Sequence, residues 1–444
     1  MEDSNRRQFL KSAALLAPAI AANAQGANDR IRVAIVGLRG RGRDHIKSYH
    51  ELASSNVEIA TFCDVDQMVM NQRAADYEKL SGKKVPMVTD MRKVLDDKSI
   101  DAVSFATPNH WHALGTIWAC QAGKDVYVEK PGSHTFVEGK RIVEAAEKYK
   151  RIVQHGTQNR SSPNIVEAVQ KLKEGVIGRV YLARGVAFKG PRPNTGTIEG
   201  EATPAGLDWD KWQGPAPEKP YSKVIHRFWH QFWDYGNGDL GNQGVHECDI
   251  IRWALDLNMH PTKVASMGGP YIRKDAEEAP QVHAVLYEWA GRDVLVTFET
   301  RSGLTNTEAG MGAEFPFLDH HNVVGVIFIG TNGFMIIPDY SSYHTFMGPK
   351  RVPGPAKVGA GDITNVPHFA NFLQAVRSRK ASDLAAGPQE LHLSAALPHF
   401  ANIAYRTGTM LHFDEKTERF VGNEAANRLL TRNYRAPYAV PAKV

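Results

Sequence analysis

Two side chains of this 444-residue chain, a lysine and a histidine far apart in the sequence, could carry out proton chemistry. Lys130 stands between Glu129 and Pro131, directly after a short apolar run. An ammonium group at the carboxyl end of a parallel strand lies at the ligand crevice, where it can stabilise oxyanion character at a reacting hydroxyl. The imidazole of His246 titrates near neutrality and can remove a hydroxyl proton. The alternatives are a surface lysine before a turn proline and a structural histidine, one of 18 in the chain.

The elements that must position Lys130 follow one another from residue 31 onward. Short β-branched apolar runs alternate there with amphipathic stretches, which is the pattern of βαβ units and a parallel sheet. The predicted strands are residues 32–36, 57–64, 102–106, 125–129 and 152–155, and the predicted helices are residues 43–52, 67–81, 110–122 and 136–149. This order predicts a Rossmann fold, with Lys130 just after its fourth predicted strand.

A glycine-rich loop follows the first predicted strand. Gly37 permits a tight turn, and Gly42 permits close packing of the next helix on the sheet. Arg39 occupies the middle glycine position of the G-x-G-x-x-G pattern, and Gly40 follows it. We therefore expect the approach of the backbone to a pyrophosphate to shift by one residue, with Arg39 or Arg41 offering a phosphate contact.

An aspartate ends the second predicted strand. A carboxylate at the position of Asp64 can accept hydrogen bonds from a ribose 2′-OH and repels a 2′-phosphate. Taken singly, Asp64 or Asp66 could equally be a solvated turn residue. The full order of strand, glycine loop, helix, strand and aspartate favours dinucleotide binding, and NAD over NADP.

Two further segments, residues 106–112 and 129–131, follow the third and fourth predicted strands. With them the chain after residue 24 resembles the Gfo/Idh/MocA family along essentially its whole length. The resemblance implies an α/β Rossmann domain at residues 29–155 and an α+β domain at residues 156–444 with a large, mostly antiparallel sheet. It also implies that Lys130 lies beside the nicotinamide and the reacting carbon. The residues it adds to the glycine loop and Asp64 as cofactor-binding candidates are Thr107, Pro108, Asn109, His112, Glu129 and Lys130.

A glycine-containing block at residues 236–249 precedes and enters a predicted helix that runs to Leu255. It resembles the family block whose histidine is the acid/base, and His246 matches that histidine. Asn242 stands where the family usually has aspartate. Because an amide cannot accept a proton or stabilise an imidazolium by charge, we expect a proton relay that differs from the ordinary dehydrogenase one.

Other carboxylates of this block could compensate for Asn242. Asp239 and Glu247 are near it in the sequence. Metal binding by His246, Glu247 and Asp249 is the rival interpretation, but adjacent residues on a helix cannot face one point. No metal site is predicted.

Aromatic residues are dense between residues 209 and 233, and their faces could pack on the apolar faces of sugars; ordinary core packing is the alternative. The substrate-binding candidates are Lys130, Trp233, Asn242 and His246, with Asn402 and Tyr405 as weaker ones. Predicted strands at residues 282–289, 294–299 and 323–330 and helices at residues 368–379 and 388–407 complete the second domain. In the family such a sheet often forms an oligomer interface, which implies a homo-oligomer.

The first 24 residues resemble a twin-arginine signal peptide. Arg6 and Arg7 precede a short apolar run at residues 13–22 and the small-residue pattern Ala22-Asn23-Ala24. Such signals serve proteins that load a cofactor before they cross the membrane, so the resemblance implies a periplasmic or otherwise exported enzyme that contacts the twin-arginine (Tat) export machinery transiently. The alternative is a disordered N-terminus that contains two arginines.

Composition excludes several classes of protein. The net charge of +5 is mild and dispersed, which argues against a nucleic-acid groove. Cys63, Cys120 and Cys248 are odd in number and far apart, which indicates neither a disulfide framework nor a Cys-x-x-Cys metal site.

Three functions are compatible with these features. The leading hypothesis is an exported NAD-dependent oxidoreductase that transfers hydride between a sugar or cyclitol hydroxyl carbon and a tightly bound nicotinamide. An NAD-dependent glycoside hydrolase, which acts by transient oxidation and elimination, is the first alternative. A non-catalytic sugar-binding protein of the same fold is the second.

Overall fold

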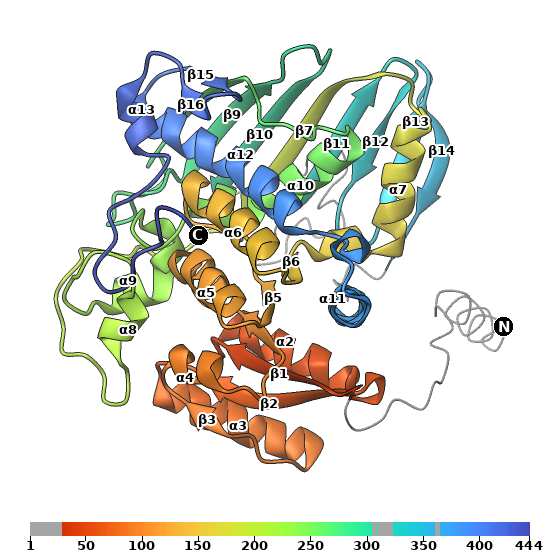
Figure 1. Ribbon diagram of the computed structural model, residues 1–444. Helices are drawn as coiled ribbons and strands as arrows, with labels where there is room; N and C mark the ends of the chain where they lie inside the picture. The colour runs from red at the N-terminus through yellow and green to blue at the C-terminus, as the bar shows by residue number, and fades with distance from the viewer. Residues whose placement is uncertain (1–28, 304–307, 309–322, 360–364) are drawn as a thin grey trace.

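The first part of the chain forms a six-stranded parallel sheet, as predicted (Figure 1). The computed structural model describes residues 29–303, 308, 323–359 and 365–444, so the predicted signal peptide lies outside the described residues. The strand order is β3-β2-β1-β4-β5-β6. The strands are β1 (Ile31–Val36), β2 (Val57–Cys63), β3 (Met87–Val88), β4 (Ala102–Phe105), β5 (Asp125–Val128) and β6 (Val153–His155). The two-residue β3 was not predicted, because so short a pairing leaves no periodic pattern.

Helices flank this sheet: α2 (Gly40–Glu51), α3 (Gln67–Ser81), α4 (Met91–Asp96), α5 (Asn109–Gln121) and α6 (Phe136–Lys148). Helix α3 is bounded as predicted, and the side chain of Asp66 caps it by accepting from Met68 N and Val69 N. Helix α2 begins three residues earlier than predicted, because Gly40 and Gly42 already belong to its first turn. The short helix α4 was not predicted.

The second part of the chain contains a ten-stranded sheet of order β14-β13-β12-β11-β7-β10-β9-β8-β15-β16. Neighbouring strands are antiparallel except for the parallel pair β7 and β10, which confirms the predicted, mostly antiparallel sheet. The strands are β7 (Val180–Lys189), β8 (Lys263–Gly269), β9 (Val282–Glu288), β10 (Leu295–Ser302), β11 (Val323–Gly330), β12 (Gly333–Ile337), β13 (Tyr343–Met347), β14 (Val352–Lys357), β15 (Leu411–Asp414) and β16 (Arg419–Phe420).

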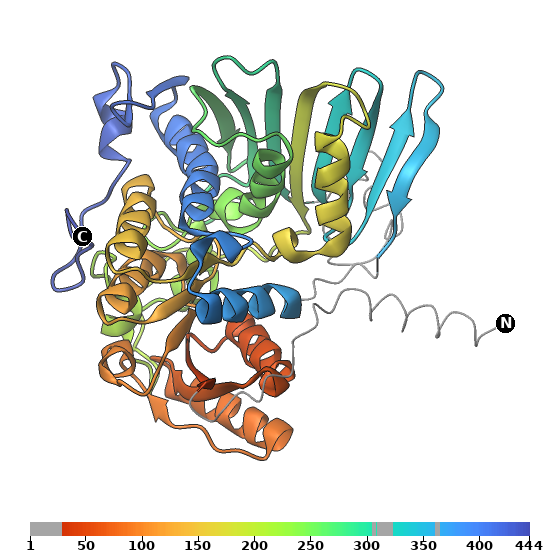
Figure 2. The same cartoon turned by 45° about the vertical axis from the view of Figure 1, so that its right-hand side comes forward.

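Three helices, α7 (Pro163–Lys173), α10 (Val245–Ala254) and α12 (Pro388–Thr407), lie against one face of this sheet (Figure 2). Their apolar side chains join those of the sheet in one buried cluster that includes Ile165, Ile251, Phe298 and Phe400. The remaining helices and short turns are η2 (Ala53–Ser55), η3 (Gln158–Ser161), α8 (Trp209–Gln213), α9 (Lys223–Phe228), η4 (Trp229–Gln231), η5 (Leu240–Gly244), α11 (Val366–Ser378), η6 (Ala381–Asp383) and α13 (Glu424–Arg428).

Segments from late in the chain help to form the hydrophobic core around the first sheet. Phe369 and Phe372 of α11 are buried with Ile35 and Tyr127 against the first sheet. Tyr438, near the C-terminus, is buried in the other apolar cluster of that sheet. Late segments of the chain therefore complete the first core.

A long segment between β7 and η5, residues 190–239, also reaches the first sheet and is called the excursion below (Figure 1). Gln67 N donates to Gly206 O over 2.9 Å, and Asp208 N donates to Val65 O over 2.9 Å. The excursion carries α8 and α9 and is thereby held beside the end of β2. No helix among the described residues is both long enough and apolar enough to cross a membrane.

Candidate active site

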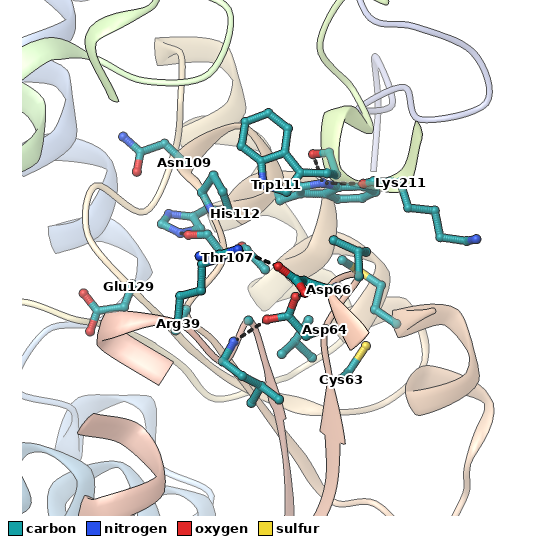
Figure 3. A pocket seen from close by; sticks show the side chains of 18 of the residues that line it. Arg39, Cys63, Asp64, Asp66, Thr107, Asn109, Trp111, His112, Glu129 and Lys211 are labelled. Atoms are coloured by element: carbon teal, nitrogen blue, oxygen red, sulfur yellow. Dashed lines mark hydrogen bonds and ion pairs between the residues drawn. The ribbon is translucent and has the colours of Figure 1, made fainter. Parts of the chain in front are cut away.

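A cavity opens at the carboxyl ends of β1, β2, β4 and β5 and holds about 1250 Å³ of empty space, its open mouth included. This is the place where open parallel sheets bind ligands. Figure 3 shows Asp64 and Asp66 close together there, with Trp111 and Lys211 beside them. The predicted cofactor-binding residues that line this cavity are Gly37, Arg39, Gly40, Arg41, Asp64, Thr107, Pro108, Asn109, His112, Glu129 and Lys130.

The glycine loop has the geometry that close backbone approach requires. Gly37 has φ +87°, and a Cβ there would lie 2.7 Å from the backbone of Ala106. A Cβ on Gly42 would lie 2.0 Å from Gly37 O, so only glycine lets α2 start against the loop. A Cβ on Gly40 would meet nothing within 4 Å. Gly40 therefore leaves open space at the start of α2, where a phosphate group fits a helix N-terminus.

Both arginines of the loop are already paired with carboxylates. Arg39 Nη2 lies 2.5 Å from Asp66 Oδ2, and Arg41 Nη2 lies 2.6 Å from Glu129 Oε1. The Arg39 side chain is 56% exposed, whereas Arg41 is largely covered. Because Asp66 and Glu129 are both buried, either arginine would have to leave a buried carboxylate to contact a phosphate, and Arg39 is the more exposed of the two.

Glu129 is an anchor between α2 and β5. Its Oε1 accepts from Arg41 and lies 3.1 Å from His45 Nε2. Burial raises the pKa of this carboxyl, but the Arg41 charge and the His45 hydrogen bond outweigh burial and hold the pKa well below its usual range. Glu129 is therefore an ionised partner of Arg41 that fixes the start of α2.

Asp64 lies at the end of β2 with its carboxylate held by the backbone. Its Oδ2 accepts from Leu38 N over 2.7 Å, and its Oδ1 accepts from Asp66 N over 2.9 Å. Burial raises its pKa, which these two hydrogen bonds oppose. The carboxylate is thus rigidly placed at the cavity wall, where it fits the predicted contact with a ribose.

The segment after β4 is held against neighbouring loops. His112 bridges two carbonyl oxygens, with Nδ1 2.6 Å from Pro131 O and Nε2 2.8 Å from Thr107 O. Asn109 Nδ2 donates to Asn237 Oδ1 over 3.4 Å. His112 therefore positions the loop that carries Lys130, and Asn109 ties this cavity to the block at residues 236–249.

Lys130 also joins the first domain to that block. Its ammonium donates to the main-chain carbonyl oxygen of Asn242, and Asn242 Oδ1 lies 3.4 Å away. Burial, with the charges of Lys189 and Arg41, outweighs the attraction of Glu129 and lowers the pKa of Lys130 to about 8. An ammonium with this pKa can give up or share its proton near neutral pH.

Asn242 sits in a turn of π-helix, η5, that runs directly into α10. Such turns are frequent at functional sites. Asn242 lines the cavity at the carboxyl ends of β1, β2, β4 and β5, called the nucleotide cavity below. It also lines a second cavity, which holds about 480 Å³ of empty space with its open mouth included. The two spaces meet at this residue.

His246 lies in the first turn of α10, as predicted, with a side chain that is almost fully buried. Among the described residues its Nδ1 has no hydrogen-bond partner, and its ring centroid lies 5.5 Å from that of Tyr340. Burial, with the charge of Lys130, holds its pKa well below its usual range, so the imidazole is neutral. His246 does not line the nucleotide cavity, so its proposed acid/base role stays a prediction.

Two carboxylates close to His246 in α10, Asp249 and Glu247, form hydrogen bonds with different groups. Asp249 accepts from Arg160 over 2.8 and 2.9 Å and from Ser394 Oγ over 2.6 Å. Glu247 Oε1 accepts from Tyr340 Oη over 3.1 Å, and burial raises the pKa of Glu247 to about 7. Within the described ranges no group of three or more histidine, cysteine or acidic side chains is arranged to hold a metal ion.

The remaining substrate candidates lie apart from both cavities. Trp233 has the guanidinium of Arg406 over its ring at 5.2 Å, and its ring centroid is 6.5 Å from that of Tyr405. Asn402 Nδ2 donates to Asn237 O over 3.0 Å and so helps to hold the block at residues 236–249, called the glycine-rich block below. Trp233 lines neither cavity, and its role in substrate binding stays a prediction.

Several residues of the nucleotide cavity were not predicted: Asp90, Arg92, Trp111, Lys211, Trp212, His226, Trp229 and Tyr438. They come from the start of α4, from α5, from the excursion that carries α8 and α9, and from the C-terminal segment. The density of aromatic residues between 209 and 233 indicated a functional surface, although it was interpreted as a sugar site. Tyr438 carries no local signal, because only the path of the C-terminal segment brings it to the cavity.

Known proteins share this architecture. An inositol 2-dehydrogenase of Saccharopolyspora erythraea is 34% identical over 53% of the chain and 59% of its own length. A glycosyl hydrolase family 109 protein of Shewanella baltica is 29% identical over 33% of the chain and 38% of its own length. The matched stretches thus span less than two thirds of these relatives.

A solved structure of levoglucosan dehydrogenase with NADH and levoglucosan covers 86% of the chain and 99% of its own length, with a TM-score of 0.64 and 17% identity, which shows a shared fold. Residues 31–157 match the NAD-binding Rossmann domain of an oxidoreductase family, and residues 175–300 and 357–440 match its C-terminal alpha/beta domain. The nucleotide cavity, with Asp64 at the end of β2 and open space at Gly40, fits NAD. The chain belongs to the Gfo/Idh/MocA family of oxidoreductases.

Proposed function

We propose that this protein is an exported NAD-dependent oxidoreductase that transfers hydride between a hydroxyl-bearing carbon of a sugar or cyclitol and a tightly bound nicotinamide. The contact between Lys130 and Asn242 carries this proposal, because it places an ammonium group where the nucleotide cavity meets the second cavity. The names of an inositol dehydrogenase and a levoglucosan dehydrogenase among the similar proteins support a polyol substrate.

The chain's own groups have distinct tasks in this reaction. Bound NAD supplies a reversible hydride acceptor. The Lys130 ammonium stabilises negative charge on the reacting oxygen. The neutral imidazole of His246 is available to take the hydroxyl proton, and Asn242 orients Lys130 through its main-chain carbonyl.

Tight retention of the cofactor is supported by the cover over the nucleotide cavity. Trp212 and Trp229 from the excursion and Tyr438 from the C-terminal segment line this cavity. Arg435 Nε donates to Gly214 O over 3.0 Å, and its guanidinium pairs with Asp210. The excursion is thus bonded to the C-terminal segment on one side and to Val65 and Gln67, which follow β2, on the other.

Mass spectrometry of the native, purified protein tests this retention. We expect one NAD per chain to survive gel filtration and dialysis. Protein that loses all dinucleotide on dialysis would show that the cover opens freely.

A panel of sugars and inositols, followed by NADH absorbance with the purified holoprotein, tests the reaction. We expect reduction of the cofactor with a subset of these polyols. If no polyol reduces the cofactor and the Lys130→Ala and His246→Ala variants bind sugars as the unchanged protein does, the protein is a non-catalytic sugar-binding protein.

A redox-neutral glycoside hydrolase is the second candidate, and Asn242 favours it. The family usually has aspartate at this position, so the proton relay differs from that of a simple dehydrogenase. The glycosyl hydrolase family 109 relative supports the same reaction. Oxidation of a glycoside hydroxyl acidifies the neighbouring C–H, and loss of that proton expels the aglycone; water then adds and the hydride returns.

Incubation with nitrophenyl glycosides separates the two reactions. Release of nitrophenol without net NADH supports the hydrolase. NADH formation without nitrophenol supports the dehydrogenase.

Export by the twin-arginine pathway is supported by residues 1–24 alone. We expect the full-length chain to reach the periplasm in a bacterial host, and the paired change Arg6→Lys with Arg7→Lys to leave it in the cytoplasm. Cell fractionation measures this, with a substitution at Lys47 of the enzyme body as the control. Light scattering tests the proposed homo-oligomer.

A further inference from the structure

The second cavity, which shares Asn242 with the nucleotide cavity, is built around two positively charged side chains. Its walls are the end of β7 and the next three residues, together with one residue of η4 and the start of the glycine-rich block. The lining residues are Lys189, Gly190, Pro191, Arg192, His230, Asp239 and Asn242. Its empty space is about 480 Å³, its open mouth included.

The two cations of this cavity differ in their partners. Arg192 Nη1 donates to both oxygens of Asp239 at 2.9 Å, and its Nη2 lies 3.1 Å from Glu277 Oε2. In the part of the chain that the structure describes, the Lys189 ammonium makes neither a hydrogen bond nor an ion pair. The charge of Arg192 is therefore balanced within the protein, whereas that of Lys189 is not.

Lys189 acts electrostatically on the groups around it. Its charge lowers the pKa of Lys130, of Asp239 and of Glu247. Lys130 lines the nucleotide cavity, Lys189 lines the second cavity, and Asn242 lines both. The positive charges of Lys130 and Lys189 repel each other, and an anion bound beside Lys189 would relieve that repulsion.

We propose that the second cavity binds the carboxylate of an acidic sugar, a uronic acid or other aldose- or cyclitol-derived acid, through Lys189. This inference rests on the proposed function and names the substrate class for the same site. Among ionic groups, a carboxylate matches Lys189 because one negative charge balances the one unpaired ammonium. A phosphate dianion would leave a second negative charge without a partner next to the Asp239 carboxylate, which Arg192 already balances.

The other walls of the cavity suit the hydroxyl groups of such a substrate. Burial lowers the pKa of His230 to about 4, so its imidazole is neutral and offers one donor and one acceptor. Asn242 adds an amide that can both donate and accept. The reacting hydroxyl would then lie toward Lys130, and the carboxylate toward Lys189.

Paired substrates with the NAD-loaded protein test the inference. Glucose and glucuronate, and galactose and galacturonate, differ only in the carboxylate, and glucose 6-phosphate adds the dianion. We expect kcat/KM at least about tenfold higher for a uronate than for its neutral parent, chiefly through a lower KM, because a hydrogen bond to a charged group contributes about 10- to 100-fold. Equal values for each pair would overturn it, and a preference for glucose 6-phosphate would replace the carboxylate with a phosphate.

Variants of Lys189 separate charge from shape. Lys189→Met should reduce the ratio of kcat/KM for uronate over parent sugar by about 10- to 100-fold, and Lys189→Arg should restore most of it. The matched control is Lys350→Met, because Lys350 is an exposed lysine in the turn between β13 and β14. This variant should keep the ratio. A ratio that survives Lys189→Met would overturn the assignment.

Binding without turnover distinguishes this inference from the proposed function. Glucuronate should raise the Tm of the NAD-loaded protein more than glucose does, and Lys189→Met should abolish the difference. This result without any NADH formation would support the acid site and contradict the oxidoreductase. Turnover of neutral sugars with no uronate effect on Tm would support the oxidoreductase and contradict the acid site.

Discussion

The ammonium of Lys130, at the end of β5, donates to the main-chain carbonyl of Asn242, 112 residues later in the chain, with Asn242 Oδ1 3.4 Å away. This contact joins the nucleotide cavity of the first domain to the glycine-rich block of the second. A main-chain carbonyl orients the ammonium without neutralising it. Burial, with the charges of Lys189 and Arg41, lowers the pKa of Lys130 to about 8.

Replacement of Lys130 tests its part in the chemistry. Lys130→Met should lower kcat by about 10²- to 10⁴-fold, the usual range for a group that assists proton transfer, while the protein still carries NAD. Initial rates and dinucleotide content measure the two effects. Lys350→Met is the control, and a Lys130→Met enzyme with unchanged kcat would contradict the assignment.

The pH dependence follows from the lowered pKa of Lys130. Its ammonium form is present below about pH 8 and is lost above it. If the ammonium stabilises the reacting oxygen, kcat/KM should fall as the pH rises through about 8. Lys130→Arg should move this limb to higher pH, because a guanidinium stays protonated. A rate that is flat to pH 10 would contradict the role.

Conversion of Asn242 to aspartate tests the same contact from the other side. A carboxylate about 3.4 Å from the Lys130 ammonium should raise the pKa of Lys130 by about 1 to 3 units. The alkaline limb of kcat/KM should then shift upward by a similar amount. An unshifted limb in Asn242→Asp would show that another group titrates there.

Two glycines of the loop should respond in opposite ways to alanine. Gly42→Ala places a Cβ 2.0 Å from Gly37 O, and should destabilise the fold by about 3 kcal/mol or more. Gly40→Ala meets no protein atom within 4 Å and should keep or slightly raise the stability, yet lose most bound NAD, because its Cβ fills the space expected for the pyrophosphate. Urea unfolding and dinucleotide content separate these effects. Full NAD occupancy in Gly40→Ala would place the pyrophosphate elsewhere.

The pair of Arg41 and Glu129 should matter for stability in a pH-dependent way. Arg41→Met leaves Glu129 buried without its main partner and should cost about 3 kcal/mol at pH 7. The pKa of Glu129 is depressed in the folded state, so its contribution is present above the unfolded value near 4.3 and is lost as the pH falls toward the folded value. The difference between the two proteins should therefore shrink in acid. Arg43→Met, exposed on the same helix, is the control.

Asp64 should decide between the two dinucleotides. Asp64→Asn removes the negative charge at the end of β2 and should raise the affinity ratio of NADP over NAD at least about tenfold. Because Asp64 accepts from Leu38 N and Asp66 N, we also expect a loss of about 1 kcal/mol in stability. Titration of NAD-free protein with each dinucleotide measures the ratio. An unchanged ratio would show that the ribose lies away from Asp64.

Local pattern alone predicted most of the first domain. The runs at β1, β2, β4 and β5 are apolar because these strands are buried on both faces, and that property depends on residues adjacent in the chain. Gly37 and Gly42 were predicted for the same reason, since their backbone geometry is a local demand. The predicted ends of helices and strands were less accurate. The start of α2 was predicted too late, because the glycines of its first turn have the composition of a loop.

Partners distant in the chain could not be predicted. The sequence offered Arg41 as a phosphate ligand, but the fold pairs it with Glu129, 88 residues away. The Arg406 guanidinium lies over the Trp233 ring, and Tyr438, which has no local signal, lines the nucleotide cavity; substrate binding by Trp233 stays a prediction.

The sequence by itself determined the parallel sheet, the nucleotide loop and the identity of Lys130 and His246 as candidates, because periodicity and short motifs are properties of neighbouring residues. Only the tertiary structure decided which groups meet. It brought Lys130 to Asn242, buried His246 without making it part of the nucleotide-cavity lining, and left Lys189 unpaired in the second cavity within the described residues. The physical reason is that contacts between domains depend on the packing of whole sheets and helices, which no local stretch of sequence encodes.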